Sequence, residues 1–196
     1  ASMIGAKWLS GHSDFIMSDI GGTTTDVGIL AGGSPRVAEQ GAEVGGWRTM
    51  VQAIDVRTIG LGGDSHVQAR LDGSLAIGPQ RAVPLSLLGH HFPDVLQMLE
   101  AELGDTEFSS LHGRFALLPF AQGERADTAG LSAREQELLS LVGERPKLLR
   151  RIAASSSALR SLESLARRGL VQLSGFTPSD AAHVLGLQDN WSRPAA

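Results

Sequence analysis

The stretch "DIGGTTTDVGIL", residues 19–30, decides the fold of the first part of this chain. An apolar run, "FIMSDI", leads into two glycines and three threonines, and a second run, "VGIL", follows the next aspartate. Two such runs around a turn predict a β-hairpin with strands over residues 15–20 and 26–31. Because both runs are apolar with little polar alternation, we expect both strands to be buried on two faces.

The turn of this hairpin is suited to bind phosphate. It supplies four residues that expose backbone N–H groups or add a hydroxyl: Gly21, Gly22, Thr23 and Thr24. On the preceding strand, the Asp19 carboxylate can hold Mg²⁺, usually through water. Asp26 either holds the turn by accepting hydrogen bonds or lies near the metal. A hairpin whose glycines serve only its geometry is the alternative, and the clustering of all these residues between two strands favours the phosphate site.

Composition excludes several classes of function. The 196 residues are 42% hydrophobic and 19% charged, which is typical of a globular protein with a core. A net charge of −4 without a basic run predicts no nucleic-acid partner. The chain has no cysteine, which excludes disulfides and thiolate metal sites. No apolar run is long enough to span a membrane and no signal peptide is recognisable, so we expect a cytoplasmic protein without a membrane partner.

The pattern of the chain changes after Pro84. Most strand signals lie between residues 15 and 78, including a hairpin that turns at Asp72–Gly73. Helical spacing dominates later, over residues 93–104 and in three short helices followed by a strand within residues 131–174. The order of the last four elements is typical of a winged helix. DNA binding is one reading of it, but the basic patch is modest, so a structural helical subdomain is the reading we favour.

The hairpin and a later glycine-rich element together resemble a known family. "DIGGTTTDVGIL" is similar to the second phosphate motif of the actin-like ATPase superfamily, which includes heat-shock chaperone ATPases and sugar kinases. "DIGGTTTDV" followed by "IDVRTIGLGGDS", residues 54–65, resembles the hydantoinase A and oxoprolinase family, whose members carry "IDxxTIGAGGGS" at the later place. The resemblance covers residues 1–78 and, through "GFTPSDAAHVLGL", residues 175–187.

The resemblance assigns binding roles to individual residues. The residues that match the family's phosphate element are Asp19, Gly21, Gly22, Thr23, Thr24 and Asp26. Those that match its second glycine element are Gly60, Gly62, Gly63 and Ser65. Asp64 stands where a third glycine is commoner, and the family's usual "GPESAG" continuation is replaced by "GPQRAVPLSLLG". The chain therefore resembles a divergent branch, and the substrate is left open.

The resemblance also implies a fold. It implies an α/β lobe of the actin-like ATPase (ribonuclease H-like) type over residues 1–90, with a mixed sheet over residues 15–78. A mainly helical subdomain, winged-helix-like at residues 131–174, would occupy residues 91–174. A C-terminal helix within residues 175–196 would return to the ATPase lobe. Because no second D-x-G-G-T motif is present, the chain would be a fragment of a two-lobed ATPase, inactive without the remaining lobe.

The activity implied by the resemblance is ATP- and Mg²⁺-dependent hydrolysis of a cyclic amide, such as a hydantoin or 5-oxoproline. Its partners would be the small-molecule substrate, the remaining lobe of the full-length chain and a hydantoinase B-like subunit. The sequence itself identifies no catalytic residue. Two other functions use the same hairpin and stay open: a small-molecule kinase of the same fold, and a nucleotide-sensing regulatory module without turnover.

Overall fold

A computed structural model describes residues 2–41, 43–44, 47–48, 51–70, 72–106, 109–119, 128–153 and 155–196 of the chain. It divides the chain into a first unit, residues 1–63, and a second unit, residues 64–196. The sequence predicts this boundary after residue 90. The structure places it earlier because the hairpin that begins at Ser65 bonds to the later part of the chain: the Val67 amide donates to the Phe176 carbonyl oxygen, 2.8 Å away.

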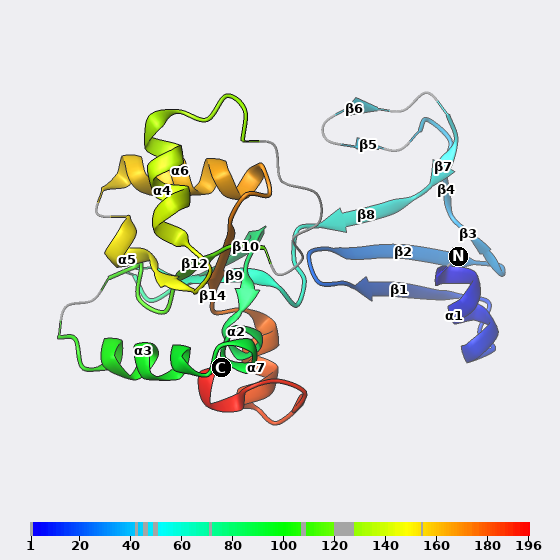
Figure 1. The fold of residues 1–196 in the computed structure, drawn as a ribbon. Helices are drawn as coiled ribbons and strands as arrows, with labels where there is room; N and C mark the ends of the chain where they lie inside the picture. The colour runs from blue at the N-terminus through cyan, green and yellow to red at the C-terminus, as the bar shows by residue number, and fades with distance from the viewer. Residues whose placement is uncertain are drawn as a thin grey trace. The chain divides into compact units, whose positions relative to one another are not determined.

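The first unit is a small antiparallel sheet with one helix. Its elements are α1 (Ser2–Ser10), β1 (Phe15–Ile20), β2 (Thr25–Ala31), β3 (Ser34–Pro35), β4 (Val37–Ala38), β5 (Glu43–Val44), β6 (Trp47–Arg48), β7 (Ala53–Ile54) and β8 (Val56–Ile59). Strand β2 lies between β1 and β8 and is antiparallel to both, and β3 pairs with the far end of β2 (Figure 1). The predicted hairpin is thus confirmed, but the predicted mixed sheet over residues 15–78 is not formed, because the strands from residue 65 onward pair separately.

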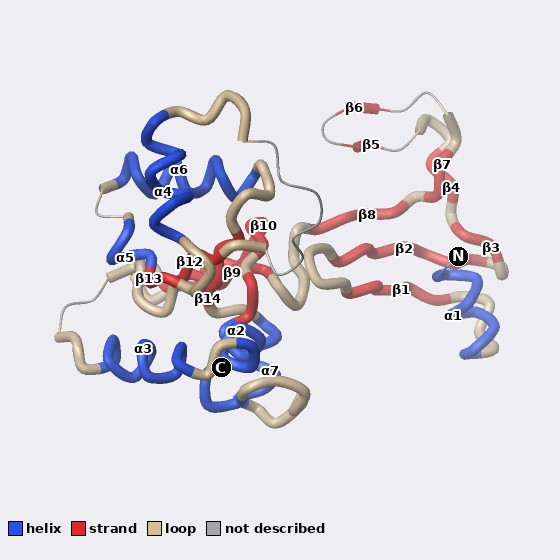
Figure 2. The backbone as a smooth tube through the Cα atoms, viewed as in Figure 1, coloured by secondary structure: helices blue, strands red, loops and turns tan. Residues whose placement is uncertain are grey.

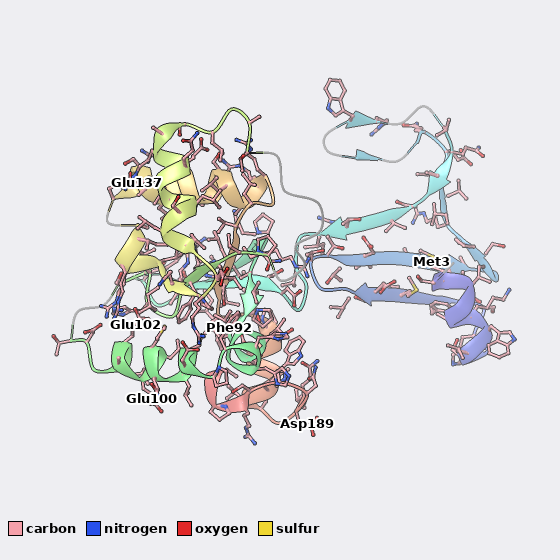
Figure 3. All side chains as sticks on the ribbon, in the orientation of Figure 1. Met3, Phe92, Glu100, Glu102, Glu137 and Asp189 are labelled. Carbon is pink, nitrogen blue, oxygen red and sulfur yellow. The ribbon has the colours of Figure 1, made fainter. Side chains whose placement is uncertain are left out.

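The two faces of this sheet differ in how much they are covered. Met3 of α1 is 6% exposed and lies against the strands at Gly28 (Figure 3). In contrast, Ile16 and Ile20 of β1 are 72% and 70% exposed. The prediction that both hairpin strands are buried on two faces is therefore wrong for β1, because within the first unit only one face of the sheet carries a helix.

The second unit has its own sheet with helices on both faces. Its elements are β9 (Ser65–Ala69), β10 (Leu75–Arg81), β11 (Val83–Pro84), α2 (Leu85–His91), α3 (Asp94–Leu103), β12 (Phe115–Leu117), α4 (Ala133–Val142), β13 (Lys147–Leu148), α5 (Leu149–Ile152), α6 (Ser156–Arg167), β14 (Gln172–Gly175), α7 (Pro178–Val184) and a 3₁₀ turn, η1 (Arg193–Ala195). The sheet runs in the order β11-β14-β12-β13. Helices α4 to α6 lie on one side of it, and α2 and α3 lie on the other (Figure 2).

Strand β12 contributes side chains to two hydrophobic cores, one on each face of the sheet. Successive side chains of a strand point to opposite faces. Ala116 packs with the apolar residues of α4, α5 and α6, whereas Phe115 and Leu117 pack with those of α2 and α3. All three residues are at most 1% exposed. The region predicted as mainly helical is therefore a helical layer on each side of a sheet, and α7 belongs to this unit rather than to the first.

Two helices of the second unit begin at a side-chain cap. Ser132 caps α4 and Glu135 returns the bond, which is a capping box. Thr177 caps α7 in the same way with Asp180, and Pro178 occupies the first helical position. In the part of the chain that the structure describes, no helix is long and apolar enough to cross a membrane.

Candidate phosphate-binding site

The site begins with the loop of the β1–β2 hairpin, residues 21–24, which we call the hairpin loop. The strands pair up to Ile20 opposite Thr25, so the loop lies directly at their end. The Gly21 amide donates a hydrogen bond to the Thr24 carbonyl oxygen, 2.8 Å away, which closes the loop. Gly21, Gly22 and Thr23 are exposed. Their backbone is therefore accessible to a ligand, as the phosphate interpretation requires.

A second loop packs against the first. We call residues 60–63 the glycine loop. The Gly63 amide donates to the Gly21 carbonyl oxygen, 3.0 Å away, and the Thr25 hydroxyl donates to the Leu61 carbonyl oxygen, 2.6 Å away. The structure thus brings together the two glycine-rich elements of the first unit that the sequence analysis singled out.

The contact between these loops explains one glycine. A Cβ atom at position 62 would lie 2.5 Å from the Gly22 carbonyl carbon and 2.5 Å from the Thr23 nitrogen. Real Cβ atoms do not approach backbone atoms so closely, and backbone cannot rotate away as a side chain can. The backbone at Gly62 therefore packs directly against the hairpin loop and supports it. The absence of a side chain at Gly62 allows the two loops to approach this closely.

The two aspartates of the motif lie on the same face of the sheet. Asp19 and Asp26 are direct partners in the β1–β2 register, and directly opposed residues of antiparallel strands share a face. The Thr58 hydroxyl of β8 donates to Asp26 Oδ1, 2.6 Å away, so Asp26 helps to hold β8 beside the hairpin. Asp19 is exposed at the end of β1. Asp26 was expected either to hold the turn by accepting hydrogen bonds or to lie near the metal. The hydrogen bond from Thr58 was not predicted.

The donor set fits a nucleotide phosphate with Mg²⁺. Magnesium in such sites is held by one or two carboxylates, by substrate phosphates and by several waters. Asp19 and Asp26 supply carboxylates on one face, and the hairpin loop supplies exposed N–H groups and hydroxyls beside them. Among the described residues, no group of three or more histidines, aspartates and glutamates could hold a metal by itself.

One predicted site residue lies in the other unit. Ser65 is the first residue of β9, pairs with Arg81 of β10 and is 1% exposed. The neighbouring Asp64 makes an ion pair with Arg81, with 2.9 Å between Oδ2 and Nη2. Asp64 and Ser65 thus help to form the start of the β9–β10 hairpin in the second unit. The role of Ser65 toward a phosphate stays a prediction.

A buried histidine in the second unit carries a perturbed pKa. His66 of β9 is 9% exposed, and its ring lies against Gly175 of β14, where a Cβ atom would be 2.9 Å from ring atoms. Burial lowers the pKa of His66 to about 4, and the nearby Arg114 cation adds to this effect. His66 is therefore neutral at physiological pH.

The shifted pKa predicts acid sensitivity. Between pH 6.5 and about 4 the unfolded chain binds a proton at His66 that the folded chain does not. Stability should therefore fall as the pH drops through this window. If the whole pKa shift of His66 contributed, the free energy of unfolding would fall by about 3 kcal/mol across this window. We expect about half of this decrease, because solvent reaches part of the ring. Urea unfolding across this range should show a weaker pH dependence in His66→Gln than in the wild type, whereas the exposed His90→Gln should behave as the wild type. An equal pH dependence in His66→Gln would contradict the assignment.

Comparisons with known proteins agree with the motifs. Residues 1–87 match the family model described as hydantoinase/oxoprolinase. A solved structure, "Mechanism of ATP-Dependent Acetone Carboxylation, Acetone Carboxylase nucleotide-free structure", is 24% identical with a TM-score of 0.38, and the match covers 43% of this chain and 13% of that chain. A comparison with curated proteins found no match. Residues 1–87, which carry the hairpin loop and the glycine loop, are thus similar to the hydantoinase/oxoprolinase family, as the resemblance of the motifs predicted.

Proposed function

We propose that the first unit is the part of an ATP-dependent enzyme that binds nucleotide phosphates, built as a lobe of the actin-like ATPase fold. The observation that carries this proposal is the pairing of the two loops. The glycine loop supports the hairpin loop through backbone contacts at Gly21 and Gly62, which leaves the outer side of the hairpin loop exposed. Phosphate recognition by backbone N–H groups needs this kind of bare, supported loop.

Each residue of the hairpin has its own proposed role in binding phosphate or Mg²⁺. Gly22 and Thr23 would donate backbone hydrogen bonds to phosphate oxygens, and Thr24 would add a hydroxyl. The Gly21 amide closes the loop by its bond to Thr24, and Gly21 would contribute by leaving the approach free of a side chain. Asp19 would hold Mg²⁺ through water, since it is exposed on the same face as Asp26. Mg²⁺ neutralises charge on the phosphates during phosphoryl transfer, and the protein contributes by positioning them.

The proposed reaction of the whole protein is hydrolysis of a small cyclic amide, coupled to ATP. Its support is the family similarity of residues 1–87. The remaining lobe of the full-length chain and the hydrolytic chemistry are part of this proposal for the whole protein. A hydantoinase B-like subunit and a cytoplasmic location are part of the same proposal.

Nucleotide binding by the full-length protein tests the role of Asp19. Asp19→Asn should weaken Mg·ATP binding by about tenfold or more, because a charged ligand to the hydrated metal is lost. Asp55→Asn is a matched control in the same unit. Asp55 pairs with Arg36 at 3.4 Å on the surface, and such pairs contribute little. Calorimetric titration with and without Mg²⁺ measures both variants, and unchanged Mg·ATP affinity in Asp19→Asn would refute the assignment.

Turnover separates the reaction classes. Incubation with ATP and a panel of hydantoins and lactams should yield ring-opened product together with ADP and phosphate. A phosphorylated product without ring opening would assign the protein to the kinases of this fold. Nucleotide binding without any turnover would assign it to the regulatory modules.

A further inference from the structure

The second unit contains a cavity, lined by both charged and apolar side chains, that the proposed ATPase function does not use. Its volume is about 650 Å³, within the range of small-molecule sites. All of its lining residues belong to the second unit, and most come from β9, β10, α6 and β14. Two of its lining side chains, Arg114 and Gln172, carry buried polar atoms, Nε and Oε1 respectively, that have no hydrogen-bond partner among the described residues.

Arg114 is the central group of this cavity. It precedes β12 and is only 9% exposed. Burial lowers the pKa of its guanidinium, and the carboxylate of Glu163 opposes that shift. Glu163 does not approach any cation within ion-pair distance in the part of the chain that the structure describes. A buried guanidinium with an unpartnered N–H is costly unless an anion or another acceptor binds it.

The charges around the cavity set the charge of its ligand. The charged lining residues are Asp64, Arg81, Arg114, Glu163 and Arg167. Asp64 and Arg81 form an ion pair, and Glu163 and Arg167 lie one helical turn apart on α6. His66 also lines the cavity and is neutral at physiological pH. Three arginines against two carboxylates leave a formal charge of +1, which a monoanion would balance and a phosphate dianion would exceed.

The remaining lining residues describe the rest of the ligand. Apolar side chains, among them Val83, Leu87 and Val171, line part of the cavity. They would contact carbon atoms of an organic molecule. The Oε1 of Gln172, which has no hydrogen-bond partner among the described residues, can accept a hydrogen bond from an N–H or O–H group of a ligand.

We propose that this cavity binds a small organic monocarboxylate, whose carboxylate pairs with Arg114 and whose N–H or O–H group donates to Gln172. The site is independent of the hairpin loop and does not rest on the proposed ATPase function. A guanidinium and a carboxylate match in both charge and hydrogen-bond geometry. The neutral His66 adds no second positive charge to the cavity, which keeps a monoanion as the matched ligand.

N-acetylglycine is a suitable probe, because it carries one carboxylate and one N–H donor on a small organic body. Amide chemical-shift changes in the 196-residue chain should titrate to saturation and should concentrate in β9, β14 and the C-terminal turn of α6. N-acetylglycinamide, which is neutral, and inorganic phosphate should each bind at least about tenfold more weakly, since a charge-assisted bond or the charge balance is lost.

Two variants test the assigned residue. Arg114→Gln should weaken N-acetylglycine binding by about tenfold to a hundredfold. Because Arg114 is buried and its variant could misfold, Glu163→Gln provides an independent test. It raises the formal charge of the cavity to +2 and should tighten binding several-fold. Arg160→Gln, on the exposed side of the same helix, should leave the affinity unchanged.

Several outcomes would overturn the proposal. These are equal binding of N-acetylglycinamide, tighter binding of phosphate, weaker binding in Glu163→Gln, and the absence of saturable shifts at high millimolar N-acetylglycine. Loss of ATP binding in the Asp19 experiment would leave these results unaffected, so failure of one proposal is distinguishable from failure of the other.

Discussion

Replacing Asp180 by asparagine should lower the free energy of unfolding of the second unit by about 3–5 kcal/mol. Asp180 is fully buried at the start of α7. Its Oδ1 accepts from the amide and the hydroxyl of Ser86, at 2.8 and 2.6 Å. Its Oδ2 accepts from the Leu85 amide at 3.1 Å and from the amide and hydroxyl of Thr177, both at 2.9 Å.

The asparagine amide cannot replace this carboxylate in either orientation. Both oxygens accept from backbone N–H groups, so the NH₂ group of asparagine would face a backbone donor whichever way it is turned. The bonds also join the starts of α2 and α7, which lie about ninety residues apart in the sequence. In one orientation the Ser86 amide of α2 is left unsatisfied. In the other, the Leu85 amide of α2 and the Thr177 amide at the start of α7 are left unsatisfied.

Urea denaturation followed by circular dichroism measures the effect, and hydrogen exchange of the amides in α7 reports the second unit specifically. Ser86→Ala removes a single hydroxyl donor and should cost about 1 kcal/mol. The control is Asp189→Asn, an exposed aspartate near the C-terminus (Figure 3), which should change stability by at most about 0.5 kcal/mol. Equal stability of Asp180→Asn and Asp189→Asn would show that this network does not stabilise the unit.

Gly62→Ala should destabilise the first unit by about 1–3 kcal/mol and should abolish the proposed nucleotide binding. The added Cβ would lie 2.5 Å from two backbone atoms of the hairpin loop and 2.6 Å from a third, the Gly21 carbonyl oxygen. The two loops must then separate, which strains the bonds from Gly63 to Gly21 and from Thr25 to Leu61. The backbone N–H groups proposed to bind phosphate would lose their support.

The matched control is a glycine with open space around it. Gly5 lies in α1, and a Cβ there would meet nothing within 4 Å. Gly5→Ala should stabilise the helix by about 0.5–1 kcal/mol, because alanine has less conformational freedom to lose. Thermal unfolding and Mg·ATP titration of both variants in the full-length protein make the comparison. If Gly62→Ala keeps wild-type stability and affinity, the glycine loop has no role in supporting the hairpin loop.

Features of this fold that depend on neighbouring residues were predictable from the sequence. The hairpin at residues 15–31 follows from two apolar runs around a turn. The capping box at Ser132 follows from Glu135 three residues later, and the cap at Thr177 follows from the threonine and the proline after it. These signals involve residues close in sequence, so a pattern can represent the whole interaction.

Features that depend on distant residues could not be predicted in this way. Helix α2 starts directly after Pro84, and its first amides are bonded by Asp180, which no local pattern reveals. The exposed face of β1 was missed because an apolar run looks the same whether or not a partner covers it. The boundary of the first unit falls at Gly63 because β9, which follows it, is bonded to the second unit. That bond, from Val67 to Phe176, again joins residues far apart in the sequence.

The two candidate sites differ in the same way, because one is built mainly from neighbouring residues and the other from distant ones. The residues of the hairpin loop were identified by composition and spacing. The family resemblance named the glycine loop as a second binding element, but the contact between the two loops was not predicted. The cavity around Arg114 left no signal, since Arg114, Glu163 and Gln172 come from three separate elements and form no motif in the sequence.

The contact between the two loops also limits how far the phosphate motif can be transplanted. The hairpin loop is completed by Leu61 and Gly63, about forty residues later in the chain. A peptide or chimera that carries only "DIGGTTTDV" would keep the residue types and lose the backbone that supports them. The motif is therefore not a portable module, and its transfer to another scaffold would require β8 and the glycine loop to be moved with it.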